Sequence, residues 1–105
     1  MISDEQAEKA ADWIRDNAGK IARAKGERVW AEEYRKSLKA MLFLNAEGGV
    51  ADRENQAYAH DHYLHHLNVL RAAVVRDEEL RAMKSAAEMK IEVWRSQSAN
   101  LRGRI

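Results

Sequence analysis

The second half of the chain carries a repeat that marks one side of a long helix. The repeating positions are Tyr63, His66, Leu70, Ala73, Asp77, Leu80, Lys84, Ala87, Ile91, Trp94, Ser98 and Leu101. Steps that alternate between three and four residues are typical of helices that pack along one another as in a coiled coil. The pattern predicts a helix over about residues 62–101. We expect its two charged members, Asp77 and Lys84, each to face an opposite charge on the neighbouring helix.

The first half predicts another long helix over about residues 4–45. Ser3 and Gln6 have the spacing of a capping box at its start. Apolar or small residues then recur at Ala7, Ala11, Ile14, Ala18 and Ile21, and continue at Ala24, Ala31, Tyr34, Leu38, Met41 and Leu42. Gly19 and Gly26 lie inside this helix, where each costs roughly 1 kcal/mol relative to alanine. Close approach of another helix would offset that cost, and a bend near Gly26 is the alternative.

Two glycines, Gly48 and Gly49, follow the last apolar residue and predict the end of the first helix. A short helix over about residues 52–59 is expected next, with Asp52 as its N-cap. Asp61 is the expected N-cap of the last helix.

Together these segments predict an all-α fold in a single helical domain over residues 1–105. The fold is a long antiparallel helical hairpin with a short connecting helix. In that register, Ile91 and Trp94 should lie near Ala11, Ile14 and Ala18 of the first helix, where the small alanines leave room for the indole. One hairpin cannot bury all three tryptophans, Trp13, Trp30 and Trp94. We therefore expect self-association as a helical bundle, with a homo-oligomer as the working form.

The amino-acid composition excludes several kinds of site and location for this protein. The 105 residues include no cysteine and no proline, and 18 basic against 17 acidic residues give a net charge of +1. The absence of cysteine excludes disulfides and thiolate metal sites. The longest apolar run, residues 40–44, is far shorter than the roughly 20 residues that span a bilayer. The acidic N-terminus lacks the apolar run of a secretory signal, so no membrane association and a cytoplasmic location are expected.

All four histidines lie within residues 60–66. His62 and His66 are four residues apart, so both rings could hold one metal ion from the same helix face. A third ligand at a fixed spacing is missing, so we interpret the cluster as structural, with His62 and His66 as weak metal candidates. No nucleophile motif, phosphate loop or zinc-protease pattern is present. We therefore expect no catalysis and no cofactor.

Two kinds of contact surface remain open. Trp30 lies off the apolar stripe between charged residues and is the best candidate for an exposed partner contact. The alternative is a nucleic-acid surface on a basic face of the first helix, made by Arg28, Arg35, Lys36 and Lys39. Interleaved glutamates at helical spacing are expected to neutralise part of that face.

Some segments resemble a group of small, mostly uncharacterised helical proteins of bacteriophages. They are Glu33-Tyr34-Arg35-Lys36-Ser37-Leu38-Lys39-Ala40, Glu79-Leu80-Arg81 and Ile91-Glu92-Val93-Trp94-Arg95-Ser96. The resemblance implies an accessory protein of the early-region type, made in the bacterial host cytoplasm. It would bind or scaffold an unidentified protein partner, with phage DNA replication or recombination as its setting. The resemblance implies no catalytic residue.

Overall fold

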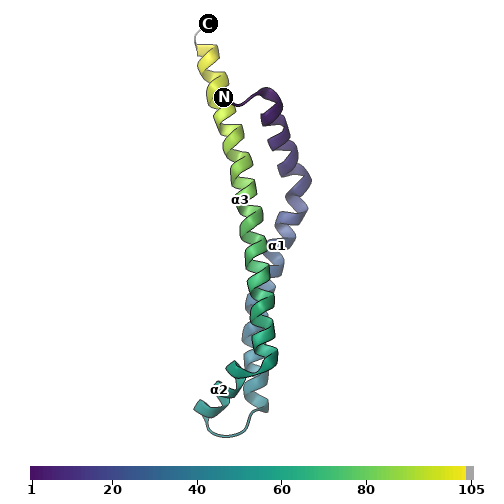
Figure 1. Cartoon of the computed structure of the whole chain (residues 1–105), viewed down its shortest axis with the longest axis vertical. Coiled ribbons are helices and arrows are strands. Elements are labelled where there is room, and N and C mark those ends of the chain that lie inside the picture. The colour runs from purple at the N-terminus through teal and green to yellow at the C-terminus, as the bar shows by residue number, and fades with distance from the viewer. Residues whose placement is uncertain (104–105) are drawn as a thin grey trace. The chain divides into compact units, whose positions relative to one another are not determined.

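The computed structural model describes residues 1–103, and these form three α-helices with no strand among them. Helix α1 spans Asp4–Asn45, α2 spans Val50–Ala59 and α3 spans Asp61–Gly103 (Figure 1). The sequence predicts 4–45, 52–59 and 62–101 for the same elements. The all-α class, with two long helices and a short one between them, is confirmed.

The helices contribute to two compact units. The terminal unit combines Met1–Arg23 with the chain from Glu78 onward, and the central unit is Ala24–Asp77. In the terminal unit, the start of α1 lies beside the C-terminal part of α3 (Figure 1). In the central unit, α2 lies beside the first turns of α3 (Figure 1). The segments of α1 and α3 run antiparallel within each unit.

The repeat on α3 corresponds to its buried side. Every predicted position from Tyr63 to Ser98 is buried or half-buried, with the single exception of Lys84. Lys84 is exposed and pairs with Glu88 of its own helix, 3.7 Å from Nζ to Oε1, so its expected partner on the neighbouring helix is wrong. Leu101 is also exposed. The 3-4 spacing therefore identified the packed face, but it could not tell that the packing weakens at a lysine and near the helix end.

The predicted stripe on α1 is partly wrong. Ala7 is buried as expected, but Ala11 and Ala18 are exposed, and Ala10 and Asn17 face inward instead. The side-chain amide of Asn17 donates to the Trp13 carbonyl at 2.8 Å, which satisfies this polar group within the helix. Adjacent alanines leave the phase of a helical stripe ambiguous, and a polar residue at an inward position conceals it further.

The two helical glycines do not mark a close helix contact. Apart from the helix's own backbone, a Cβ atom at Gly26 would meet nothing within 4 Å, and the nearest atoms to one at Gly19 belong to the side chain of Arg23 on the same helix. The expected compensation by an approaching helix is therefore wrong. Both positions keep the intrinsic cost of glycine in a helix.

The helix starts follow one prediction and depart from two. Gln6 N–H donates to Ser3 Oγ at 3.1 Å and Ser3 N–H donates to Gln6 Oε1 at 2.9 Å, which confirms the capping box. Gly49, not Asp52, is the N-cap of α2, and it forms no side-chain cap hydrogen bond. His60 rather than Asp61 caps α3, since its Nδ1 accepts from the His62 N–H at 3.0 Å. A histidine ring nitrogen can replace a carboxylate here because only an acceptor is needed.

The register in the terminal unit is shifted from the expected one. Trp94 Nε1 donates to Asp4 Oδ1 at 2.7 Å, and the N–H of Ile2 donates to Gln97 Oε1 at 2.9 Å. Trp94 and Ile91 share a shallow hollow with Asp4, Ala7, Glu8 and Ala11. Of the residues expected beside Trp94, only Ala11 lies there. Asp4 holds the indole nearer the start of α1 than the pattern of apolar residues indicated.

The turn of the central unit is held by side chains of α2. Arg53 Nε donates to the Gly48 carbonyl at 2.9 Å, and Gln56 Nε2 donates to the Glu47 carbonyl at 2.7 Å. Gly48 has φ 110°, in the left-handed region that favours glycine. A Cβ atom there would also lie 3.3 Å from the Cβ of Asp52. This position therefore requires glycine.

Candidate protein-binding surface

Helices α1 and α3 of the central unit border a shallow groove next to Trp30. Its walls are formed by Glu27, Trp30, Ala31, Val69, Ala72, Ala73 and Arg76, and we call it the Trp30 groove. It encloses about 320 Å³ and is mainly apolar. The α3 residues that line it stand at positions i, i+3, i+4 and i+7 from Val69 to Arg76, so they share one side of the helix. The short side chains of Ala31, Ala72 and Ala73 leave the space between the two helices unfilled.

The indole of Trp30 is exposed but held in place. Its exposed fraction is 60%, in line with the exposure expected from the sequence. The ring stacks on Tyr34 with centroids 5.0 Å apart and planes 8° apart, and it makes an edge-to-face contact with His66, with centroids 6.3 Å apart. Stacked and edge-to-face contacts of this kind stabilise a ring beyond its area burial. The indole therefore presents a large apolar surface in a restricted orientation.

His66 supports this aromatic group from within. It is buried, and its Nε2 lies 2.7 Å from the Ala31 carbonyl oxygen. A carbonyl can only accept, so Nε2 carries the proton and donates. The imidazole also meets Tyr34 edge-on, with centroids 5.0 Å apart. His66 thus ties α3 to α1 directly behind the exposed indole.

Charged residues of opposite sign flank the groove. Glu27 comes from α1 and Arg76 comes from α3, and both are exposed. Within residues 1–103, neither of these two side chains forms an ion pair. The adjacent inward-facing pair is Arg28 and Asp77, with Nη1 and Oδ2 3.1 Å apart. Asp77 is 1% exposed, so the opposite charge predicted for it on the neighbouring helix is confirmed.

The predicted nucleic-acid residues separate into two groups. Arg28 binds Asp77 and also Glu32, with Nε and Oε1 3.0 Å apart, so it serves the helix contact. The other three line a second pocket of about 430 Å³, which contains Arg35, Lys36, Lys39, Tyr58 and Tyr63. We call this the basic pocket. The structure therefore brings three of the four predicted cations together with two tyrosines.

Lys39 is the most constrained cation of the basic pocket. Its Nζ lies 4.5 Å from the centroid of the Tyr58 ring and 3.6 Å from Glu54 Oε1. Hydrogen bonding to Tyr58, followed by the charges of Tyr58 and Glu54, raises the pKa of Lys39 above its ordinary value. Lys36 pairs with Glu33, with Nζ and Oε1 3.3 Å apart. Carboxylates thus already neutralise two of the three cations.

The histidine cluster lies at the start of α3. His62, His65 and His66 border one hollow with Tyr34 and Leu38. His66 Nε2 is already engaged by the Ala31 carbonyl, and no group of three His, Cys, Asp or Glu side chains that could hold a metal ion occurs in residues 1–103. His60 caps α3, as described above. All four histidines therefore have structural neighbours within the fold.

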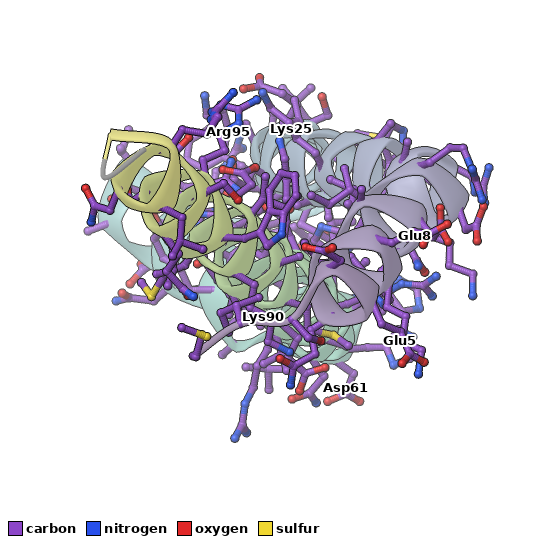
Figure 2. The ribbon with its side chains drawn as sticks, turned by 90° about the horizontal axis from the view of Figure 1, so that it is seen from above. Glu5, Glu8, Lys25, Asp61, Lys90 and Arg95 are labelled. Atoms are coloured by element: carbon purple, nitrogen blue, oxygen red, sulfur yellow. The ribbon has the colours of Figure 1, made fainter. Side chains whose placement is uncertain are left out.

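The terminal unit carries another apolar groove that the sequence analysis did not single out. It encloses about 360 Å³ between α1 and α3 and is lined by Gln6, Lys9, Ala10, Trp13, Met83, Ala86, Ala87 and Lys90. Met83 is 52% exposed, although it lies beside the buried Ala87 on the face of this groove. Charged residues such as Glu5, Glu8 and Arg95 lie at the outside of this unit (Figure 2).

A signal for both grooves was available in the sequence. Val69, Ala72 and Arg76 repeat at steps of three and four, immediately beside the positions of the α3 repeat. Met83, Ala86 and Lys90 do the same further along the helix. Each set ends in a basic residue, so the apolar positions beside the packed face are Val69, Ala72, Met83 and Ala86, and they widen the apolar side of α3.

Comparison with protein-family models, with curated proteins and with solved structures found no match. In residues 1–103, none of the helices combines the length and apolar character that a membrane-spanning segment requires.

Proposed function

We propose that the protein acts by protein–protein binding, as a non-enzymatic helical scaffold, and that the Trp30 groove is its contact surface. The observation that carries this proposal is the indole of Trp30, which is 60% exposed yet fixed by Tyr34 and His66. Tryptophan in a restricted orientation is a frequent energetic centre of protein interfaces. Little rotational freedom would be lost on binding, which favours affinity.

The size of the exposed apolar surface supports a protein partner. A tryptophan side chain contributes up to about 250 Å², so covering the exposed part of Trp30 would remove about 150 Å² from water. At about 25 cal/mol per Å², this corresponds to about 4 kcal/mol of gross stabilisation from one residue. Val69 is 40% exposed in the same groove and adds to the apolar surface.

The biological setting belongs to the same proposal. The resemblance to small bacteriophage proteins favours an accessory role in the cytoplasm of a bacterial host. There the protein would act as a scaffold in phage DNA replication or recombination.

A capture experiment tests the proposal. The tagged chain is incubated with nuclease-treated extract of infected and uninfected host cells, and bound proteins are identified. We expect wild type to retain a protein that Trp30→Ala loses, whereas Val29→Ala retains it. Val29 is the matched control because it is the neighbouring residue on α1 and is 48% exposed. Equal capture by Trp30→Ala and wild type would contradict the proposal.

Nucleic-acid binding is the second candidate function, and the basic pocket is the observation that favours it. Arg35, Lys36 and Lys39 could contact phosphates while the half-exposed Tyr58 stacks on a base. The carboxylates of Glu33 and Glu54 compete for two of these cations. This competition is the reason that we rank the pocket below the Trp30 groove.

Salt dependence distinguishes the two functions. A nucleic-acid complex that uses several cations loses affinity steeply between about 50 and 200 mM salt, whereas an apolar protein contact does not. Binding of a labelled single-stranded oligonucleotide is followed by fluorescence anisotropy for wild type, Arg35→Ala and Trp30→Ala. Salt-sensitive binding that Arg35→Ala weakens and Trp30→Ala leaves unchanged would establish the second function.

A further inference from the structure

We propose that a second copy of this chain occupies the Trp30 groove, with a two-fold axis parallel to the helices, so that Glu27 of each copy pairs with Arg76 of the other. This inference rests on the proposed function, since it names the occupant of the same surface.

The charges at the groove indicate the partner. Glu27 on α1 and Arg76 on α3 stand at the same end of the groove, next to the inward-facing pair Arg28 and Asp77. In residues 1–103 neither Glu27 nor Arg76 has an ion-pair partner. A surface with one acidic and one basic rim is complementary to itself after a two-fold rotation. A chain of net charge +1 also brings little repulsion to such a pair of copies.

The direction of the axis follows from the requirement that α1 of one copy faces α3 of the other. An axis parallel to the helices places α1 of one copy over α3 of the other at the same level. Glu27 then meets Arg76 twice, once on each side of the axis. An axis across the helices would place α1 over α1 and α3 over α3, so Glu27 of one copy would not face Arg76 of the other. Only the parallel axis brings these opposite charges together, so the charge pattern selects it.

The apolar part of the groove fits the same arrangement. The parallel axis lays Trp30 of one copy over α3 of the other, where Val69, Ala72 and Ala73 lie. Ala72 and Ala73 are small and leave space for an indole above the helix. The four segments of α1 and α3 would form an antiparallel four-helix arrangement, in which each exposed indole is covered.

Charge exchange tests this geometry. Sedimentation equilibrium is measured over a concentration series for wild type, Glu27→Arg, Arg76→Glu and an equimolar mixture of the two variants. We expect wild type to dimerise in the micromolar range and each variant alone to dimerise at least about tenfold more weakly, because both of its pairs become repulsive. In the mixture the two variants should form a heterodimer with affinity near that of wild type, since both pairs are then attractive.

The controls separate this effect from misfolding and from surface charge in general. Glu33→Arg and Lys36→Glu reverse an exposed ion pair of α1 outside the groove and should dimerise like wild type. The milder Glu27→Gln and Arg76→Gln should each weaken dimerisation without loss of helical circular dichroism. A mixture no more dimeric than its components would overturn the proposal, as would a monomeric wild type throughout the series. If wild type is monomeric but Trp30-dependent capture from extract persists, this inference fails and the proposed function stands.

Discussion

Among single changes to residues that contact the first turns of α1, removal of the Trp94 side chain should destabilise the terminal unit the most. The half-buried indole lies over Ala7, Glu8 and Ala11, and its Nε1 donates to Asp4 Oδ1 at 2.7 Å. Because Asp4 begins α1, this contact attaches the first turn of that helix to α3. Trp94→Ala removes both the apolar contact and the hydrogen bond.

The magnitude follows from the two contributions. About 150 Å² of buried indole at about 25 cal/mol per Å² gives about 4 kcal/mol as an upper value. Residual burial in the unfolded chain lowers this by roughly 10–40%. The exposed hydrogen bond to Asp4 adds about 0.5–1 kcal/mol. We expect Trp94→Ala to lower the free energy of unfolding by about 3 kcal/mol, and Trp94→Phe by about 1 kcal/mol.

Urea denaturation followed by circular dichroism at one fixed protein concentration measures these values. A double-mutant cycle of Trp94→Phe with Asp4→Ala should give a coupling energy of about 0.5–1 kcal/mol, the share of the hydrogen bond. Val93→Ala is the control, because Val93 precedes the indole and is 44% exposed, and it should change stability by less than about 0.5 kcal/mol. A loss below about 1 kcal/mol for Trp94→Ala would refute the packing described for the terminal unit.

The remaining predictions concern backbone, cap and metal. Gly26→Ala should stabilise the chain by about 1 kcal/mol, because the added Cβ meets open space in a helix. Gly48→Ala should destabilise the chain by more than about 1 kcal/mol, because φ at this position is 110°. Urea denaturation that gave the opposite sign for each variant would contradict the description of both sites. Ser3→Ala should cost about 1 kcal/mol through loss of the capping box, and a value near zero by the same assay would show that the box contributes nothing. Neither added zinc nor a chelator should shift the melting temperature of wild type or of the double variant His62→Gln/His66→Gln, because His66 Nε2 already donates to a backbone carbonyl. A zinc-dependent rise of several degrees in wild type alone would reveal a metal site.

The fold class and the packed face of α3 could be predicted from the sequence because of the periodicity of that helix. A repeat that includes Leu70, Leu80 and Ile91 can only be buried on one side of a helix, so its direction is unambiguous. On α1 the corresponding positions are alanines next to other alanines, and the choice of Ala11 over Ala10 could not be made from hydrophobicity. The inward position of Arg28 was concealed for a related reason, since a basic residue in a polar stretch shows its burial only when its partner Asp77 is placed.

The candidate site was predictable in part. The flanking charges identified Trp30 as exposed, but its support by Tyr34 and His66 depends on how two helices far apart in sequence meet. The grouping of Arg35, Lys36 and Lys39 with Tyr58 depends in the same way on where α2 packs. Local spacing gives the face of a helix, whereas the partner of that face comes only from the tertiary arrangement.

Photo-crosslinking at position 30 tests the central claim most directly. A chain with p-benzoylphenylalanine in place of Trp30 keeps an aromatic ring in the groove and forms a covalent bond with whatever covers it. The same group in place of Glu33, an exposed residue outside the groove, is the control. We expect a nuclease-resistant protein adduct from position 30 in cells that express the chain, and little or none from position 33. No adduct at position 30, equal adducts at both positions, or an adduct that nuclease removes would contradict it.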